Sequence, residues 1–238
     1  MIEARGLTRR FGQVTVVDGV DLVLDGRGVV GFLGPNGAGK STVLRMMAGA
    51  LSPTAGAVRI AGFDVSTDPV EVKARLGYLP EVPPLYEDLT VGESLQYVAA
   101  LHGLGRSSTR GAEVLARVGL EGASRRRVGA LSRGLRQRLG LAQALVHDPP
   151  VLLLDEPTTG LDPLQRIALR ELIRELGEEH LVLLSTHLLD EVERVADRIA
   201  ILHRGRLRGE GTLAELAAQA ASGPSLEQVF VALTVEAS

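Results

Sequence analysis

One short segment restricts the possible folds of this chain more than any other: a glycine-rich turn between an apolar run and a helical pattern. The turn fits the spacing G-x-x-x-x-G-K-[ST] and consists of Gly34, Pro35, Asn36, Gly37, Ala38, Gly39, Lys40, Ser41 and Thr42. The apolar run 29–33 precedes it, and the helical pattern 42–50 follows it. A strand, a glycine turn and a helix in this order place main-chain N–H groups in front of a positive helix end. The segment therefore predicts a phosphate-binding loop.

The residue types in this loop are those that a triphosphate requires. Lys40 carries a compact charge that reaches the outer phosphates, and the Ser41 hydroxyl can bind Mg²⁺. Lysine is rare here, since Lys40 and Lys73 are the only two among 26 basic residues. The planar fork of arginine does not replace lysine inside a tight nest of amides. The alternative, a plain glycine-rich turn, is disfavoured by the fixed spacing and its context.

Two acidic residues end the apolar run 151–154 and form the second candidate for chemistry. In phosphate-transferring enzymes with such a loop, an acid at this strand end holds Mg²⁺ and the next residue can activate water. We expect Asp155 to be a magnesium ligand together with Ser41, and Glu156 to be the catalytic base. The alternative is a pair of turn carboxylates before Pro157, and only the loop at 34–42 makes the motif specific.

A histidine follows another apolar run, 181–184. His187 would lie at the carboxyl end of a central strand and would face the same crevice as the glycine loop. There it would contact the γ-phosphate and orient water, as a third catalytic candidate beside Lys40 and Glu156. Four other histidines occur, at 102, 147, 180 and 203, so the residue taken alone favours a structural role.

Composition excludes several classes of protein. The 238 residues are 45% hydrophobic and 23% charged, which is an ordinary globular balance. No stretch approaches the roughly 20 apolar residues that span a bilayer, and the start lacks an apolar signal core, so we expect a cytoplasmic chain. The absence of cysteine excludes disulfides and thiolate metal sites. A net charge of −3 and few aromatic residues argue against a nucleic-acid partner.

Short apolar runs alternate with helical patterns along the chain. We expect strands at 14–17, 20–24, 29–33, 56–63, 151–154 and 181–184, and helices at 42–50, 90–101, 111–118, 135–146 and 164–176. The texture between 82 and 130 is helical, which indicates an inserted helical segment. Strands that are apolar on both sides and alternate with helices predict an α/β fold with a mainly parallel sheet covered on both faces.

Taken in order, the motifs resemble the ATP-binding subunit of an ABC transporter. They are the loop 34–42, Leu131-Ser132-Arg133-Gly134-Leu135, the run 152–156, Gly160-Leu161-Asp162 and His187. The likeness covers nearly the whole chain, and 131–135 separates this family from other phosphate-loop proteins. It implies a single domain of P-loop NTPase type that binds ATP and Mg²⁺. Its parts would be a core with an N-terminal antiparallel β subdomain (about 1–81 and 131–215), a helical subdomain (about 82–130) and C-terminal tail helices (about 216–238).

The resemblance also implies a site shared between two copies of the chain. Ser132 and Gly134 would close on the γ-phosphate bound by a second subunit, so that a homodimer encloses two ATP molecules, and Asp162 would cross this interface. Phe11 resembles the aromatic that stacks on adenine, although a core position is the equal alternative. Glu81 occupies the place where the family often has a Gln that contacts Mg²⁺.

Some residues differ from the family's signature sequence, and other stretches resemble one subgroup of the family. Arg133 and Leu135 replace the usual Gly and Gln of the signature, while Ser132 and Gly134 are kept. The stretches 78–81, 131–138 and 225–230 resemble ATPases of bacterial ABC-2 type exporters. This likeness implies ATP hydrolysis that powers export through a separate transmembrane permease, with the chain peripheral on the inner face of the cell membrane.

Three other functions are alternatives to this one. They are a soluble ABC ATPase of translation or DNA repair, a nucleotide-gated regulatory module that seldom hydrolyses, and a small-molecule kinase. Each motif occurs once and no long heptad arms are present, which disfavours the first. The intact Lys40, Asp155, Glu156 and His187 disfavour the second. A kinase leaves the segment 131–135 unexplained.

Overall fold

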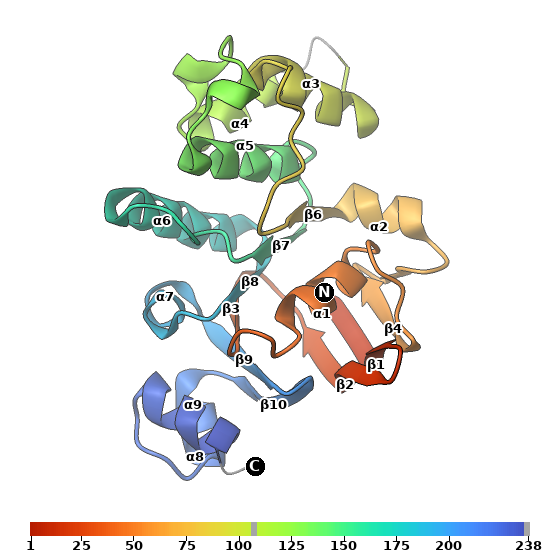
Figure 1. Ribbon diagram of the computed structural model, residues 1–238, viewed down its shortest axis with the longest axis vertical. Helices are drawn as coiled ribbons and strands as arrows, with labels where there is room; N and C mark the ends of the chain where they lie inside the picture. The colour runs from red at the N-terminus through yellow and green to blue at the C-terminus, as the bar shows by residue number, and fades with distance from the viewer. Residues whose placement is uncertain (106–108, 236–238) are drawn as a thin grey trace.

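A computed structural model describes residues 1–105 and 109–235 of the chain, and it contains two β-sheets (Figure 1). The smaller sheet is antiparallel, with strand order β2-β1-β4-β5. Its strands are β1 (Ile2–Phe11), β2 (Val14–Leu24), β4 (Ala55–Ile60) and β5 (Phe63–Asp64). The larger sheet has the order β10-β9-β3-β8-β7-β6 and is parallel except for β10. Its strands are β3 (Gly28–Leu33), β6 (Leu76–Leu79), β7 (Val151–Asp155), β8 (Leu181–Thr186), β9 (Arg198–His203) and β10 (Arg206–Gly211).

Helices cover the larger sheet and extend the molecule at both ends (Figure 1). They are α1 (Lys40–Met47), α2 (Pro69–Arg75), α3 (Val91–Leu101), α4 (Arg110–Arg117), α5 (Arg133–Leu145), α6 (Pro163–Glu179), α7 (Leu189–Val195), α8 (Leu213–Gln219) and α9 (Leu226–Val235). Helices α3, α4 and α5 form a lobe at one end, and α8 and α9 pack together at the other. Among the described residues, no helix has the length and apolar character needed to cross a bilayer.

The central strands are buried on both faces, as the apolar runs predicted. Every residue of β7 and β8 is buried. Alternate side chains of β7 enter different cores: Leu152 and Leu154 pack with residues of α3–α6, whereas Val151 and Leu153 pack with α1 and the antiparallel sheet. The mainly parallel α/β fold expected from the sequence, with its antiparallel β portion, is therefore confirmed.

Three neighbouring strands carry the candidate residues to one edge of the sheet. β8 lies between β3 and β7 and is parallel to both. Leu33 is paired with Thr186, and Asp155 is paired with Ser185. The glycine loop after β3, the acidic pair at the end of β7 and the histidine after β8 consequently meet at the carboxyl edge, where open α/β sheets bind ligands.

Turn chemistry explains where the predicted strands differ from the observed ones. The expected strand 56–63 is two strands, β4 and β5, because Ala61 and Gly62 both adopt left-handed conformations (φ 49° and 89°) and form a tight hairpin. The two short strands expected at 14–17 and 20–24 are one strand, β2. Gly19 takes a φ of 62°, and shifts of register against β1 let the strand continue through this point.

The predicted helices match observed helices and differ from them only at their ends. Helix α3 begins after Thr90, whose side chain accepts from the Glu93 backbone N–H while the Glu93 carboxylate accepts from Thr90, as the capping pattern predicted. Helix α1 begins at Lys40 rather than at 42 and ends at Met47. The sequence pattern does not place the strands β1, β6, β9 and β10 or the helices α2 and α7, which lack clear periodicity. For the region of α8 and α9, only the family resemblance implied helices, at about 216–238.

A close approach at Gly77 provides a test of this packing. A Cβ built on Gly77 in β6 would lie 2.2 Å from the backbone oxygen of Ala144 in α5. We expect Gly77→Ala to destabilise the fold by about 2 kcal/mol, which lowers Tm by about 4–8 °C. The matched control is Gly122→Ala, since a Cβ there meets nothing within 4 Å. Equal melting temperatures for the two variants would contradict this packing.

Candidate active site

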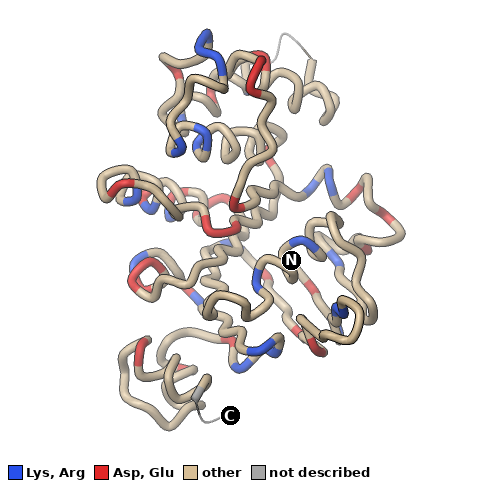
Figure 2. The backbone as a smooth tube through the Cα atoms, in the orientation of Figure 1, with Lys and Arg blue, Asp and Glu red and all other residues tan. Residues whose placement is uncertain are grey.

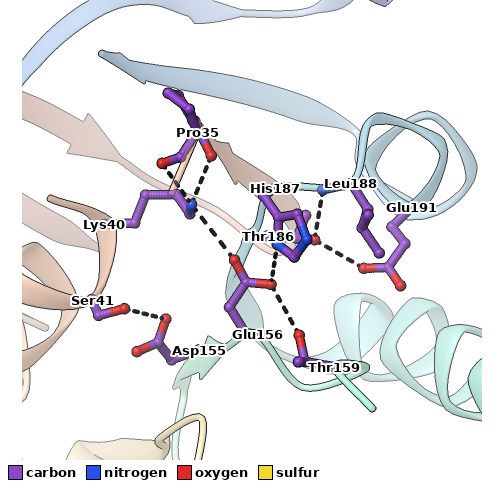
Figure 3. Close-up of polar contacts among 11 residues, drawn as sticks. Pro35, Lys40, Ser41, Asp155, Glu156, Thr159, Thr186, His187, Leu188 and Glu191 are labelled. Carbon is purple, nitrogen blue, oxygen red and sulfur yellow. Dashed lines mark hydrogen bonds and ion pairs between the residues drawn. The ribbon is translucent and has the colours of Figure 1, made fainter. Parts of the chain in front are cut away.

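The glycine loop curls around the amine of Lys40. Gly34 follows β3, and a Cβ on it would lie 2.3 Å from the Leu202 oxygen, so only glycine fits. Gly39 has a φ of 105°, which starts α1 directly at Lys40. The Lys40 Nζ donates to the carbonyl oxygens of Gly34 (2.7 Å) and Pro35 (3.4 Å), and its side chain is only 6% exposed (Figure 3). A buried ammonium is thus held inside the loop by backbone oxygens.

The acidic pair faces this loop from the end of β7. The Ser41 hydroxyl donates to Asp155 Oδ1 at 3.1 Å. Glu156 adopts a left-handed backbone with φ 48°, an unfavourable conformation for a residue with a Cβ. Its backbone N–H donates to the Ser185 oxygen at 2.9 Å. This backbone carries the Glu156 carboxylate toward Lys40, and Oε1 lies 3.5 Å from Nζ.

The other oxygen of Glu156 is held by two side chains (Figure 3). His187 Nδ1 lies 2.9 Å from Glu156 Oε2. The Thr159 hydroxyl donates to the same oxygen at 3.2 Å. Thr159 was missed by the sequence reasoning, and its only signal is its position three residues after Glu156 on the same turn. His187 lies in the same cleft as the glycine loop, as its position after a central strand predicted.

These residues line one open cleft of about 390 Å³. It contains most of the predicted loop, the candidate base and histidine, and the predicted metal ligand Glu81. The lining residues are Val16, Asn36, Gly37, Ala38, Gly39, Lys40, Ser41, Thr42, Glu81, Glu156, Thr159 and His187. Asp155 lies just beneath this surface, 1% exposed and hydrogen bonded to Ser41.

Burial shifts the proton affinities in the cleft. Burial lowers the pKa of Lys40 from its ordinary value, although nearby Glu156, Asp155 and Glu81 oppose the shift. Burial raises the pKa of Asp155, and the negative charges of Glu156 and Glu81 add to it, against the hydrogen bond from Ser41. Acidic positions gather in this middle region of the molecule (Figure 2). The cleft therefore holds more buried negative charge than one lysine neutralises.

The donor set of this cleft fits a magnesium ion. Mg²⁺ prefers oxygen ligands and is commonly held by one or two carboxylates together with substrate phosphates. The Ser41 hydroxyl and the Asp155 carboxylate already adjoin, and Glu81 lines the same cleft. A divalent cation would also offset the excess negative charge that raises the pKa of Asp155.

The remaining predicted residues lie outside the lining of the cleft. Ser132 caps α5 by accepting from the Leu135 N–H (3.4 Å), and Asp162 caps α6 by accepting from the Gln165 N–H (3.0 Å). Gly134 is buried, and a Cβ on it would lie 2.3 Å from the Gln165 Oε1. Within one copy of the chain, the N-termini of α5 and α6 therefore lie outside the lining of the cleft that contains the glycine loop.

Phe11 also lies outside the lining of the cleft. Its side chain is 47% exposed and is covered on one face by the Arg9 guanidinium, 4.6 Å from the ring centre. The alternative interpretation of Phe11 as a core residue is therefore wrong. An exposed ring near the end of β1 remains available for stacking.

Comparison with known proteins gives a consistent result. The family model described as "ABC transporter" matches residues 17–159, more than half of the chain. The ABC transporter ATP-binding protein NatA of Bacillus subtilis (strain 168) is 40% identical over 91% of both chains. The bacitracin transport ATP-binding protein BcrA of Bacillus licheniformis is 39% identical, over 88% of this chain and 69% of that protein.

Solved structures agree with the sequence relatives. A structure of an ATP-binding subunit of an ABC transporter superposes with a TM-score of 0.89 at 34% identity, covering 98% of this chain and 99% of that one. The ATP-binding cassette MJ0796, solved as a dimer in a post-hydrolysis state with ADP and Pi, superposes with a TM-score of 0.80 at 26% identity, covering 89% and 98%. The chain belongs to the ABC transporter family, in which it is an ATP-binding subunit that hydrolyses ATP.

Proposed function

We propose that two copies of this chain enclose two MgATP molecules and that hydrolysis opens the dimer to power export through a separate membrane subunit. The observation that carries the proposal is the contact of the buried Lys40 and Glu156 with each other, and of Glu156 with the partly exposed His187, at the carboxyl edge of the sheet. The three residues supply a cation for phosphate, a carboxylate for water and an imidazole beside the carboxylate. Binding and cleavage of a triphosphate need these three functions together.

The first step is the entry of the triphosphate tail into the glycine loop. Backbone N–H groups of 36–41 and the ammonium of Lys40 would receive the phosphate oxygens. In the structure, Lys40 is shared among two carbonyl oxygens and Glu156 Oε1. A phosphate carries more negative charge than these partners, so Lys40 turns toward it. Glu156 Oε1 then loses its ion pair and becomes available to water.

The second step is the attack of water on the γ-phosphorus. Glu156 takes a proton from the water as the new O–P bond forms, and the O–P bond to the leaving ADP breaks. His187 and Thr159 hold the other carboxylate oxygen, which keeps Oε1 aimed at the phosphate. Mg²⁺, held by Ser41, Asp155 and Glu81, would supply positive charge to the phosphate oxygens.

The second copy would supply the missing half of the site. The signature helix α5 opens at Ser132, which is exposed, and Asp162 opens α6. Both helix starts carry positive ends that suit a phosphate, but neither lies in the chain's own cleft. A C₂ dimer places them over the partner's loop, and ATP then joins the two copies. The dimeric state of the cassette MJ0796 supports this arrangement.

The membrane subunit is proposed to dock on the helical lobe and the segment leading to it. Four large apolar side chains are exposed there: Val82 (76%), Tyr86 (60%), Tyr97 (45%) and Leu101 (69%). Tyr86 and Tyr97 contact each other edge to face, with ring centres 5.7 Å apart. Exposed apolar groups of this kind favour a protein partner, and that partner would hold the chain at the inner face of the membrane. The name of a relative, the bacitracin transport ATP-binding protein BcrA, supports a role in transport.

The first prediction concerns Lys40. Lys40→Ala removes the cation of the phosphate loop, so we expect kcat/KM for ATP to fall at least about 100-fold. Lys73→Ala is the control, because Lys73 is the other lysine and is exposed on α2. Phosphate release measured at several ATP concentrations checks the result. Wild-type turnover by Lys40→Ala would remove Lys40 from the mechanism.

The second prediction concerns Glu156. Glu156→Gln keeps an oxygen for Thr159 but does not accept a proton, so we expect hydrolysis to slow at least about 100-fold. ATP binding persists, and the closed dimer accumulates in size-exclusion chromatography with MgATP. Glu175→Gln, an exposed glutamate on α6, is the control. A Glu156→Gln variant that turns over like wild type shows that another group is the base.

The third prediction concerns pH and Asp155. Its raised pKa means that the charged carboxylate is less favourable in the fold than in the unfolded chain, so the free energy of unfolding falls as pH rises from the ordinary value of 3.8 through the raised pKa. We expect Asp155→Asn to raise Tm without nucleotide at neutral pH by about 2–4 °C, which corresponds to about 1 kcal/mol. The same variant loses the extra stability that MgATP confers on wild type.

Asp88→Asn is the control for this measurement, because Asp88 is an exposed aspartate far from the acidic pair in sequence. Thermal unfolding is followed from pH 5 to pH 8, with and without MgATP. If Asp155→Asn melts below wild type at neutral pH without nucleotide, the burial of its charge is not unfavourable. Full stabilisation by MgATP in that variant would exclude Asp155 as a magnesium ligand.

A further inference from the structure

A buried carboxylate on α7 has no part in the mechanism described above. Glu191 is fully buried, with 0% of its surface exposed. Its Oε2 accepts a hydrogen bond from the Thr186 hydroxyl at 3.0 Å. Among the described residues, its Oε1 has no hydrogen-bond partner. Burying a carboxylate costs free energy that hydrogen bonds only partly offset. The hydrogen bond with Thr186 therefore indicates where Glu191 acts.

The Thr186 hydroxyl connects this carboxylate to the peptide that follows His187. Thr186 ends β8 and is itself fully buried. Its Oγ1 accepts from the Leu188 backbone N–H at 3.1 Å while it donates to Glu191 (Figure 3). A hydroxyl has one proton to donate, and donation to Glu191 directs its lone pairs toward the amide. His187 is the residue between the two anchored positions.

This arrangement replaces the usual N-terminal cap of a helix. Leu188 is the N-cap residue of α7, and its apolar side chain does not cap the helix. In an ordinary capping box, the acidic residue three positions later bonds to the N-cap N–H directly. Here Glu191 reaches that N–H through Thr186. The backbone on both sides of His187 is thereby tied to one buried carboxylate.

We infer that Glu191 is a positioning residue for ATP hydrolysis, which acts through Thr186 to hold the imidazole of His187 against Glu156. The inference rests on the proposed roles of His187 and Glu156. His187 Nδ1 lies 2.9 Å from Glu156 Oε2, and the ring is 35% exposed, so packing alone does not fix it. The hydrogen bond between Leu188 N–H and Thr186 fixes the backbone from which the His187 side chain extends. The imidazole then orients the carboxylate of Glu156.

The test compares Glu191→Met with Glu191→Gln. Met has a similar length but no acceptor oxygen, whereas Gln retains one for Thr186. We expect Glu191→Met to lower kcat about tenfold, with KM for MgATP changed less than about twofold, because one positioned hydrogen bond is lost. Glu191→Gln keeps kcat within about twofold of wild type. Glu193→Met, exposed on the same helix, controls for the substitution itself.

Two further measurements separate positioning from a purely structural role. Thr186→Val lowers kcat as Glu191→Met does, and the double variant is no slower than Thr186→Val, since both act along one path. The imidazole resonances of His187, assigned by comparison with His187→Gln, shift in Glu191→Met and not in Glu191→Gln. If Glu191→Met does not fold, Thr186→Val and the hydroxyl-retaining Thr186→Ser replace the pair in both measurements.

The inference is overturned if wild type hydrolyses ATP and Glu191→Met has the same kcat. It is overturned equally if kcat falls without any change in the His187 resonances, or if the effects of Glu191→Met and Thr186→Val add. Failure of the proposed function looks different, because wild type itself would then release no phosphate from MgATP.

Discussion

The contact between Lys40 and Glu156 organises the rest of the site. A buried ammonium and a buried carboxylate lie 3.5 Å apart, at the junction of the glycine loop and the end of β7. Each charge stabilises the other there, because removing one partner leaves the other buried charge with hydrogen bonds alone. The pair therefore requires the left-handed backbone of Glu156, the close turn at Gly34 and the parallel order of β3, β8 and β7 that brings them together.

In the mechanism that we propose, the same pair gives the nucleotide a direct effect on the base. A triphosphate would compete with Glu156 for Lys40, so that binding of the substrate would free the carboxylate that is proposed to act in its hydrolysis. The other oxygen of that carboxylate stays fixed by Thr159 and His187. Asp155, Glu156 and Glu81 together carry a surplus of negative charge, which a magnesium ion would offset. The proposed mechanism thus links nucleotide binding, the metal and catalysis through electrostatics within one cleft.

The sequence predicted the structure correctly where the local hydrophobic pattern directly reflects burial in the fold. The runs 151–154 and 181–184 are apolar throughout because both faces of β7 and β8 are buried, and their carboxyl ends placed the acidic pair and His187 in one cleft with the loop. The antiparallel hairpin at Ala61 was missed because an alanine in a left-handed conformation gives no sequence signal. Short elements such as β6 and α7 take their structure from neighbours rather than from periodicity.

The sequence pattern does not predict individual contacts among side chains. Thr159 and Glu191 belong to no motif, and their importance arises only from the oxygen atoms they approach. Arg133, a departure from the family signature, lies against Gly160, where a Cβ would be 2.5 Å from its guanidinium carbon. The replacement thus joins the start of α5 to the turn that carries Thr159, a contact that spacing alone does not reveal.

A structure of the chain with a non-hydrolysable ATP analogue and Mg²⁺ tests the central claim most directly. The account predicts that the Lys40 Nζ leaves the carbonyl oxygens of Gly34 and Pro35 for the outer phosphates, and that Glu156 Oε1 then faces the γ-phosphate without an ion pair. A structure in which the analogue is bound while Lys40 remains on Glu156 and the loop carbonyls would contradict it.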